Sequence, residues 1–234
     1  MPLPIAELAV PSISHPRGFD VGAARAHVSR DRKFAPWLTK IEPIVPDPRW
    51  QAAFDPVDAL ARAILFQQLS GKAASTIVGR VEKAIASDLL HADTLGRVDD
   101  ETLRGCGVSG NKVRALRDLS ERATRGEIPG VDDMAGLTSD AIIATLTPVR
   151  GIGRWTVEMM LIFRLGRPDV LPIDDLGVRR GAQHIDRLAL APTPKALAAR
   201  GERWAPYRSY AALALWRIAD LQSAAGAPVN RSQE

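Results

Sequence analysis

The chain has 234 residues, of which 46% are hydrophobic and 25% are charged, and its formal net charge is +4 at pH 7. This length can form one core of good size or two smaller lobes, and the composition is that of an ordinary globular protein. The single cysteine, Cys106, excludes an intrachain disulfide and any metal or iron–sulfur site built from four cysteines. The excess of cations suits a polyanionic partner without being specific for one.

The sequence predicts neither a membrane protein nor a secreted one. No run approaches the roughly 18 apolar residues that span a bilayer, and the residues after Met1 do not form a signal peptide. The histidines are too scattered for a metal cluster; they are His15, His27, His91 and His184. We therefore expect a soluble cytoplasmic protein without a cofactor, associated with the nucleoid if the source is bacterial.

Capping residues followed by apolar residues at helical spacing predict helices along most of the chain. Asp55 and Pro56 open the first, which continues through an apolar stripe to Phe66. Ser70 caps a helix at 71–85, and Ser109 caps one that continues to Leu119. Further helices are expected at about 99–104, 139–146, 156–165, 175–185, 194–203 and 207–219.

The fold class predicted from these patterns is all-α. No segment shows sustained alternation of apolar and polar residues with β-branched side chains, which an extended sheet requires. Residues 10–18 and 223–234 are rich in Pro, Ser, Gly and polar side chains, so we expect both to be loose, the second as a disordered tail.

A short connection between two predicted helices has the features of a phosphate-binding turn. It contains Gly151, Ile152 and Gly153, and glycines allow tight turns with positive φ and close backbone approach. The helix that follows begins with N–H groups that lack intrahelical partners, and its dipole favours an anion. The alternative is a plain helix–helix connection in which Ile152 provides the packing.

Four segments together carry a resemblance to a known family. They are Arg62–Ser70 (RAILFQQLS), Leu146–Thr156 (LTPVRGIGRWT), Pro172–Arg179 (PIDDLGVR) and Trp204–Trp216 (WAPYRSYAALALW). In this order, the segments resemble the DNA-3-methyladenine glycosylase II family of the helix-hairpin-helix (HhH-GPD) DNA glycosylase superfamily. The resemblance covers about residues 55–220, and the chain is too short for the N-terminal sheet domain of the longer members.

The resemblance implies one catalytic unit, 1–234, made of two helical lobes with an interdomain active-site cleft. Residues 60–172 would form the helix-hairpin-helix lobe, and residues 1–59 with 173–234 would form the second lobe. The catalytic residue implied is an aspartate at the start of the helix after the hairpin, where Asp174 and Asp175 lie side by side. We favour Asp175, because in the family pattern the aspartate follows Trp155 by twenty positions; Asp174 is the alternative, and both could simply cap the helix.

An aspartate suits the chemistry of N-glycosidic hydrolysis, because a carboxylate stabilises the oxocarbenium-like sugar and orients the attacking water. An alkylated purine already carries a positive charge, so no second acid is needed to protonate it as it leaves.

Trp155 occupies the position of the Schiff-base lysine of bifunctional members, so the resemblance implies a monofunctional enzyme. It further implies a base pocket formed by Trp155, Trp216, Met159 and Leu176. At the positions of Met159 and Leu176, bacterial relatives often have tyrosine. For each of these side chains, core packing is the alternative.

Gln68 is the side chain that the resemblance assigns to the gap left by the flipped nucleotide, with Gln67 pointing inward. The alternative is that both glutamines satisfy loop backbone groups. The resemblance assigns the remaining DNA contacts to Gly151, Gly153, Arg154 and Thr156. A monovalent cation on the hairpin carbonyls near Val149 and Ile152 is left open.

The function implied is excision of alkylated purines, of the 3-methyladenine and 7-methylguanine type, from duplex DNA in base excision repair. The enzyme would act as a monomer and leave an abasic site. The alternatives are a non-catalytic helix-hairpin-helix DNA-binding module, a lyase of the same superfamily, and a structural protein.

Overall fold

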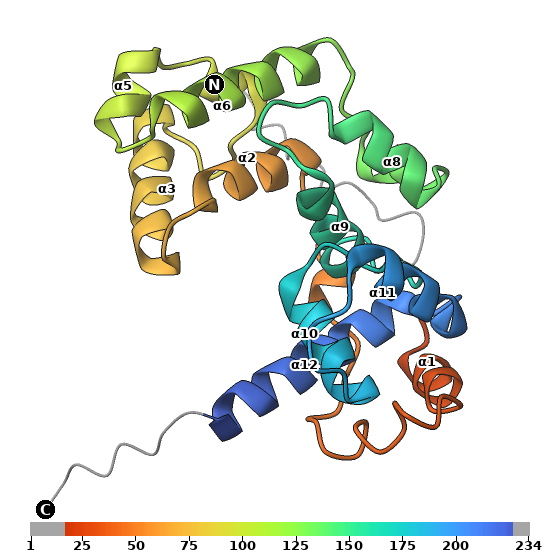
Figure 1. Ribbon diagram of the computed structural model, residues 1–234. Coiled ribbons are helices and arrows are strands. Elements are labelled where there is room, and N and C mark those ends of the chain that lie inside the picture. The colour runs from red at the N-terminus through yellow and green to blue at the C-terminus, as the bar shows by residue number, and fades with distance from the viewer. Residues whose placement is uncertain (1–16, 227–234) are drawn as a thin grey trace, which may run out of the picture. The chain divides into compact units, whose positions relative to one another are not determined.

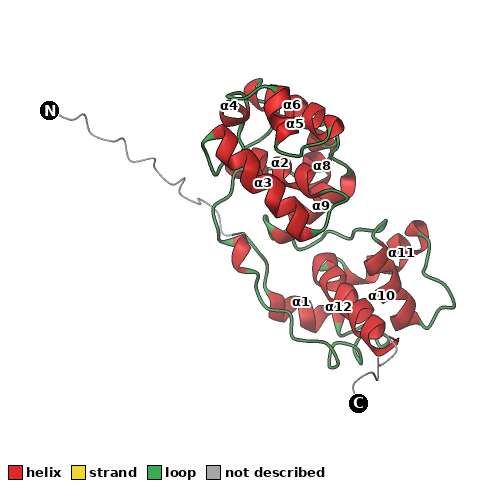
Figure 2. Ribbon diagram, turned by 90° about the vertical axis from the view of Figure 1, so that its left-hand side faces the viewer, coloured by secondary structure: helices red, strands yellow, loops and turns green. Residues whose placement is uncertain are grey.

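The computed structural model describes residues 17–226, and every regular element in this range is a helix (Figures 1 and 2). The all-α prediction is therefore confirmed. None of the described helices combines the length and the apolar character that a membrane span requires. The chain divides into two compact units, of which the first contains residues 51–157 and the second contains residues 17–50 and 158–226.

The first unit is built around α2 and α6, which pack against each other (Figure 1). The helices of this unit are α2 (Pro56–Phe66), α3 (Gly71–Ile85), α4 (Ala92–Leu95), α5 (Asp100–Gly105), α6 (Gly110–Thr124), α7 (Val131–Ala135) and α8 (Ser139–Leu146). Each of the longer helices begins at a capping side chain: Oδ1 of Asp55 accepts from the Asp58 N–H at 2.8 Å, and Ser70 and Ser109 cap α3 and α6 in the same way.

The second unit is built around the pair α10 and α12, which lie side by side (Figure 1). Its helices are α1 (Val21–Val28), the 3₁₀ turn η1 (Pro48–Trp50), α10 (Leu176–Asp186), α11 (Pro194–Gly201), the 3₁₀ turn η2 (Glu202–Trp204) and α12 (Arg208–Gly226). The boundary between the units falls within α9 (Arg154–Phe163). Phe34, Trp204 and Tyr210 are the largest fully buried side chains of this unit.

A glycine allows α10 and α12 to approach each other closely. A Cβ added at Gly181 would lie 2.2 Å from the Leu215 carbonyl oxygen, far inside van der Waals contact. Because Gly181 has no side chain, the backbones of the two helices can pack directly.

The unit boundaries differ from the expected lobes, which were 60–172 and 1–59 with 173–234. Residues 51–59 join the first unit because α2, which begins at Pro56, packs within it. Residues 158–172 join the second unit because the Trp50 indole donates to the Ile162 carbonyl at 2.8 Å and Arg17 donates to the Arg164 carbonyl at 3.0 Å.

The predicted helices are all present, with changes at their ends. Helix α9 begins two residues earlier than expected, and α12 continues to Gly226, so the expectation of a loose segment from Ser223 is wrong for 223–226. Residues 227–234 and 10–16 lie outside the described residues. The short helices α1, α4 and α7 were not predicted.

Candidate active site and nucleic-acid interface

Asp175 lies at the start of α10, and its Oδ1 accepts hydrogen bonds from a backbone N–H and from an indole N–H. As the N-cap residue it receives the Val178 N–H at 2.9 Å, and the Trp216 indole N–H donates to the same Oδ1 at 2.8 Å. Trp216 lies 41 residues away on α12, so this second bond depends on the packing of the two helices. The carboxylate is half-buried and is fixed by both donors.

Gly177 makes room for this arrangement. A Cβ at Gly177 would lie 2.8 Å from Cδ1 of Trp216 and 3.1 Å from Oδ1 of Asp175. Any side chain at this position would therefore push the indole away from the carboxylate. The sequence Asp175-Leu-Gly177 accordingly supplies both the acceptor and the space for its donor.

An aromatic stack continues from Trp216. The Phe163 ring is stacked on the Trp216 ring, with centroids 5.8 Å apart and an angle of 25° between their planes. The Arg49 guanidinium lies over Phe163, 4.7 Å from the centroid, and hydrogen bonds to Asp47, so the pKa of Arg49 is raised and that of Asp47 is lowered. Sequence reasoning missed Phe163 and Arg49, since no local motif marks either residue.

The two aspartates have different surroundings. Asp174 is exposed and makes no hydrogen bond with the described residues, whereas Asp175 caps α10 and receives Trp216. Leu176 is 50% exposed and Met159 is half-buried; both belong to the second unit with Asp175 and Trp216. Trp155 is also 50% exposed and belongs to the first unit.

The hairpin between α8 and α9 lies in the first unit and turns at Gly151, whose φ is +80°. Ile152 is buried, as expected for the side chain that packs the turn. Gly153 does not have a positive φ, and a Cβ added there would meet no heavy atom within 4 Å. Its missing side chain leaves the backbone accessible instead.

The hairpin presents N–H groups that the described chain leaves without acceptors. The N–H groups of Gly151 and Gly153 donate to none of the described residues. The Arg150 N–H, in contrast, donates to Oδ2 of Asp118 at 2.7 Å, which fastens the turn to α6. Arg154 is exposed and Thr156 is half-buried at the start of α9. This arrangement can bind an anion.

The loop between α2 and α3 is tied to the hairpin. The Gln67 side-chain amide donates to the Gly151 carbonyl at 2.7 Å, so Gln67 satisfies a loop backbone group, as the alternative stated. The Lys112 ammonium donates to the carbonyls of Leu65 and Gln67 at 2.8 and 2.9 Å, and burial lowers the pKa of Lys112. Between these fixed points, Gln68 is exposed and has a left-handed backbone with φ +57°.

No three His, Cys, Asp or Glu side chains of the described residues are grouped as a metal site requires. The candidate residues thus fall into two sets, each within one unit. Asp175, Trp216, Leu176 and Met159 belong to the second unit. Gln68, Trp155 and the hairpin belong to the first.

Comparison with known proteins identifies the family. Residues 61–206 match the family of HhH-GPD superfamily base excision DNA repair proteins. The chain is 38% identical over 169 residues to DNA-3-methyladenine glycosylase 1 of Schizosaccharomyces pombe, which covers 71% of this chain and 74% of that protein.

Two solved structures are similar in fold and sequence. The S. pombe 3-methyladenine DNA glycosylase Mag1 in complex with abasic DNA matches with a TM-score of 0.70 and 34% identity, covering 83% of this chain and 95% of that one. A DNA-3-methyladenine glycosidase from Bacillus halodurans matches with a TM-score of 0.77 and 35% identity, covering 86% and 90%. The chain belongs to the HhH-GPD superfamily of base excision DNA repair proteins.

Proposed function

We propose that this protein is a monofunctional DNA glycosylase that hydrolyses the N-glycosidic bond of alkylated purines in duplex DNA and leaves an abasic site. The 3-methyladenine and 7-methylguanine type of lesion is the substrate class. The observation on which the proposal depends is the Asp175 carboxylate, fixed at the start of α10 by Val178 and Trp216. The named activities of the S. pombe and B. halodurans relatives support it.

Asp175 supplies the negative charge that the reaction needs. As the purine leaves, the sugar acquires oxocarbenium character, and a fixed carboxylate stabilises that charge without having to reorganise. The same carboxylate orients the attacking water. The two N–H donors hold the group in one orientation, which is the preorganisation that makes such electrostatic stabilisation effective.

The aromatic side chains account for the choice of an alkylated base. A purine alkylated at N3 or N7 is cationic, and stacking on an indole face is worth about 1–2 kcal/mol when water is excluded. We assign this role to Trp216 and Trp155, and we assign Met159 and Leu176 to aliphatic contacts with the base. The cationic purine departs as a neutral base, so no general acid is required.

The absence of a lysine nucleophile at Trp155 makes the reaction purely hydrolytic. A lyase of the same superfamily forms a Schiff base between lysine and the sugar, and an indole cannot do so. Borohydride should therefore trap no covalent adduct between this protein and damaged DNA.

DNA is positioned by the first unit in this proposal. The N–H groups of Gly151 and Gly153 bind a phosphate, Arg154 and Thr156 add contacts to the backbone, and Gln68 fills the space of the flipped nucleotide. The Val149 carbonyl already accepts from the Ile152 N–H at 3.0 Å and has a second lone pair for a monovalent cation, while Ile152 supplies a neighbouring carbonyl. Both units act on the same duplex as one catalytic unit, in a monomer that works in the compartment of the DNA, the cytoplasm and nucleoid in a bacterium.

A pair of substitutions tests the assignment of Asp175. Asn keeps the oxygen that accepts from Val178 and Trp216 but removes the charge, so Asp175→Asn should fold normally and bind DNA containing an abasic-site analogue. Its single-turnover release of 3-methyladenine and 7-methylguanine from defined duplexes should fall by about 10²–10³-fold.

Asp174→Asn is the matched control, because Asp174 is adjacent but makes neither hydrogen bond. It should release bases at the wild-type rate. Full activity in Asp175→Asn, or a large loss in Asp174→Asn alone, would contradict the assignment. Wild-type protein that binds duplex DNA but releases no base from any lesion would favour the non-catalytic DNA-binding module.

A further inference from the structure

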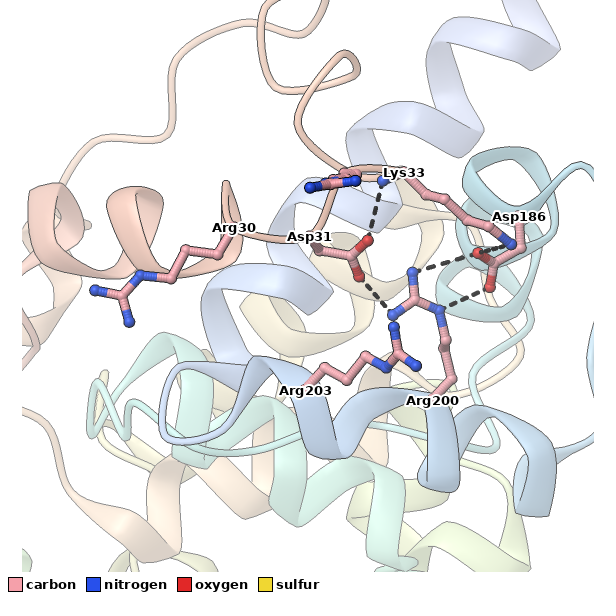
Figure 3. Close-up of a pocket in the computed structure, with 7 residues that line it drawn as sticks. Arg30, Asp31, Lys33, Asp186, Arg200 and Arg203 are labelled. Carbon is pink, nitrogen blue, oxygen red and sulfur yellow. Dashed lines mark hydrogen bonds and ion pairs between the residues drawn. The ribbon is translucent and has the colours of Figure 1, made fainter.

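A hollow on the second unit is lined entirely by charged residues (Figure 3). It has a volume of about 640 Å³ and lies where the loop after α1 meets the ends of α10 and α11. We call it the basic hollow; its lining residues are Arg30, Asp31, Arg32, Lys33, Asp186, Arg200 and Arg203.

The acidic side chains of the basic hollow are already neutralised. Arg200 bridges both of them, at 2.5 Å from Asp31 and 2.9 Å from Asp186, and Lys33 lies 3.3 Å from Asp186 (Figure 3). Burial raises the pKa of Asp31, but hydrogen bonds from Arg200 and Trp204 outweigh it, and the pKa lies below its ordinary value. These four side chains, two cations and two carboxylates, are linked by ion pairs and carry no net charge.

The other cations of the basic hollow form no ion pairs with the described residues. Arg30, Arg32 and Arg203 are exposed and form no ion pair or side-chain hydrogen bond there. A second hollow shares Arg32 and Lys33 and adds Lys40 and Arg187.

The net charge of the chain is concentrated in these two hollows. Together they are lined by seven cations and two carboxylates, a net charge of +5, whereas the whole chain carries +4. The remainder of the chain is therefore close to neutral. Such a concentration of like charge creates a potential that attracts polyanions.

Arg187 occupies a backbone position that favours glycine. It ends α10 in the left-handed conformation with φ +54°, where glycine is the usual residue. Its side chain lines the second hollow and makes no hydrogen bond with the described residues. An arginine here adds strain to the folded chain, and its side chain gains no hydrogen bond or ion pair with the described residues.

The basic hollow is separate from the candidate catalytic residue. Asp175 precedes α10, while Asp186 and Arg187 end it, and 11 residues of helix give a separation of about 16 Å along the axis. No residue assigned to catalysis or to the hairpin lines either hollow.

We propose that the basic hollow and its neighbour form a second binding site for the phosphate backbone of DNA. Arginine predominates, and its planar guanidinium donates two parallel hydrogen bonds to phosphate oxygens, which lysine cannot do. DNA is favoured over an acidic protein segment because members of the family work on DNA. The phosphates come either from the flanking part of the lesion duplex or from a second duplex.

The salt dependence of binding tests this site. The variant Arg32→Ala/Arg203→Ala removes two partnerless cations and leaves the Arg200 network intact. The control, Arg104→Ala/Lys195→Ala, removes two exposed cations that line neither hollow. For a 40-bp undamaged duplex, the slope of log K against log salt should decrease by about 1–2 in the variant, since each phosphate contact contributes about 0.9, and should stay unchanged in the control.

Two further arms identify the source of the phosphates. If the flanking duplex is bound, the variant should bind a 12-bp duplex like wild type and lose affinity only for the 40-bp one. If a second duplex is bound, wild-type protein should bring two differently labelled 12-bp duplexes into energy-transfer distance, and the variant should not. An unchanged salt slope at both lengths without bridging would overturn the proposal in favour of an acidic protein partner.

Arg187→Gly tests the site with a variant whose expected loss of DNA contacts cannot be explained by a loss of stability. This variant should melt at a higher temperature than wild type because it relieves the left-handed strain, yet show a smaller salt slope. Ala86→Gly is the matched control, since Ala86 ends α3 with φ +52°; it should melt higher with an unchanged slope. Base release from a 12-bp lesion duplex should be retained in all these variants, which separates failure of this site from failure of the proposed catalytic function. A wild-type salt slope in Arg187→Gly would contradict the role of Arg187.

Discussion

Gln68 offers a prediction in which stability and activity change in opposite directions. Its backbone is left-handed, with φ +57°, and its side chain is exposed in a loop held by Gln67 and Lys112. A non-glycine residue in this conformation costs about 1–2 kcal/mol, and glycine loses about 0.5–1 kcal/mol more backbone entropy on folding. Gln68→Gly should therefore raise the free energy of unfolding by about 0.5–1 kcal/mol, which is about 2 °C in Tm for a chain of this size.

The same substitution removes the side chain proposed to fill the space of the flipped nucleotide. Flipping costs a few kcal/mol of stacking, and a side chain that recovers about 1.4 kcal/mol of it changes the rate about tenfold. Single-turnover excision by Gln68→Gly should therefore be about tenfold slower than wild type, on a protein that melts at a higher temperature by circular dichroism.

Gln68→Ala is the control for this pair of effects, because alanine keeps the left-handed strain but lacks the long side chain. It should excise as slowly as the glycine variant and melt close to wild type. Wild-type excision by both variants would refute the role of Gln68 in filling the duplex. A lower Tm for Gln68→Gly would refute the assignment of strain.

Two further predictions concern the second unit. Gly177→Ala places a Cβ 2.8 Å from Cδ1 of Trp216, so the indole must shift and lose its hydrogen bond to Asp175. Base release should therefore fall at least tenfold. The free energy of unfolding, measured in urea, should change less than this strain alone would cause, because alanine gains roughly 1 kcal/mol in helix propensity over glycine. Wild-type activity in this variant would show that the indole does not position the carboxylate. The pKa of Asp31 is lowered, so its stabilising effect is complete above the ordinary value of 3.8 and is lost as the pH falls below it. The difference in unfolding free energy between wild type and Asp31→Asn should thus be constant near neutral pH and shrink below about pH 4; a difference that grows there would contradict the sign of the shift.

Much of the helical framework could be predicted because its signals are local. Asp55, Ser70, Ser109 and Asp175 each combine a capping oxygen with a following helix, and all four cap in the structure. The helices α1, α4 and α7 have eight or fewer residues and begin or continue without a strong apolar stripe. Their formation depends on contacts with the rest of each unit, which sequence periodicity does not contain.

The contacts that define the candidate sites could not be predicted from spacing. Trp216 reaches Asp175 across 41 residues, and Gln67 reaches Gly151 across 84. The family resemblance supplied the residues, but not these bonds or the stacking of Phe163. The basic hollow was missed for the same reason: its cations come from two segments, 30–33 and 200–203, which lie far apart in the sequence and meet only in the folded unit.

Three non-glycine residues of the described chain have left-handed backbones, and only two of them call for a functional explanation of the strain. Ala86 loses only a methyl group if it becomes glycine, so its strain needs no functional explanation. Gln68 and Arg187 have long polar side chains that hydrogen-bond to none of the described residues. Among the described residues no side-chain hydrogen bond or ion pair offsets their strain of about 1 kcal/mol or more. We therefore expect that each of these side chains stabilises a complex with a bound partner, to which its exposed N–H groups can donate. The partner that we propose is the duplex interior for Gln68 and the DNA backbone for Arg187.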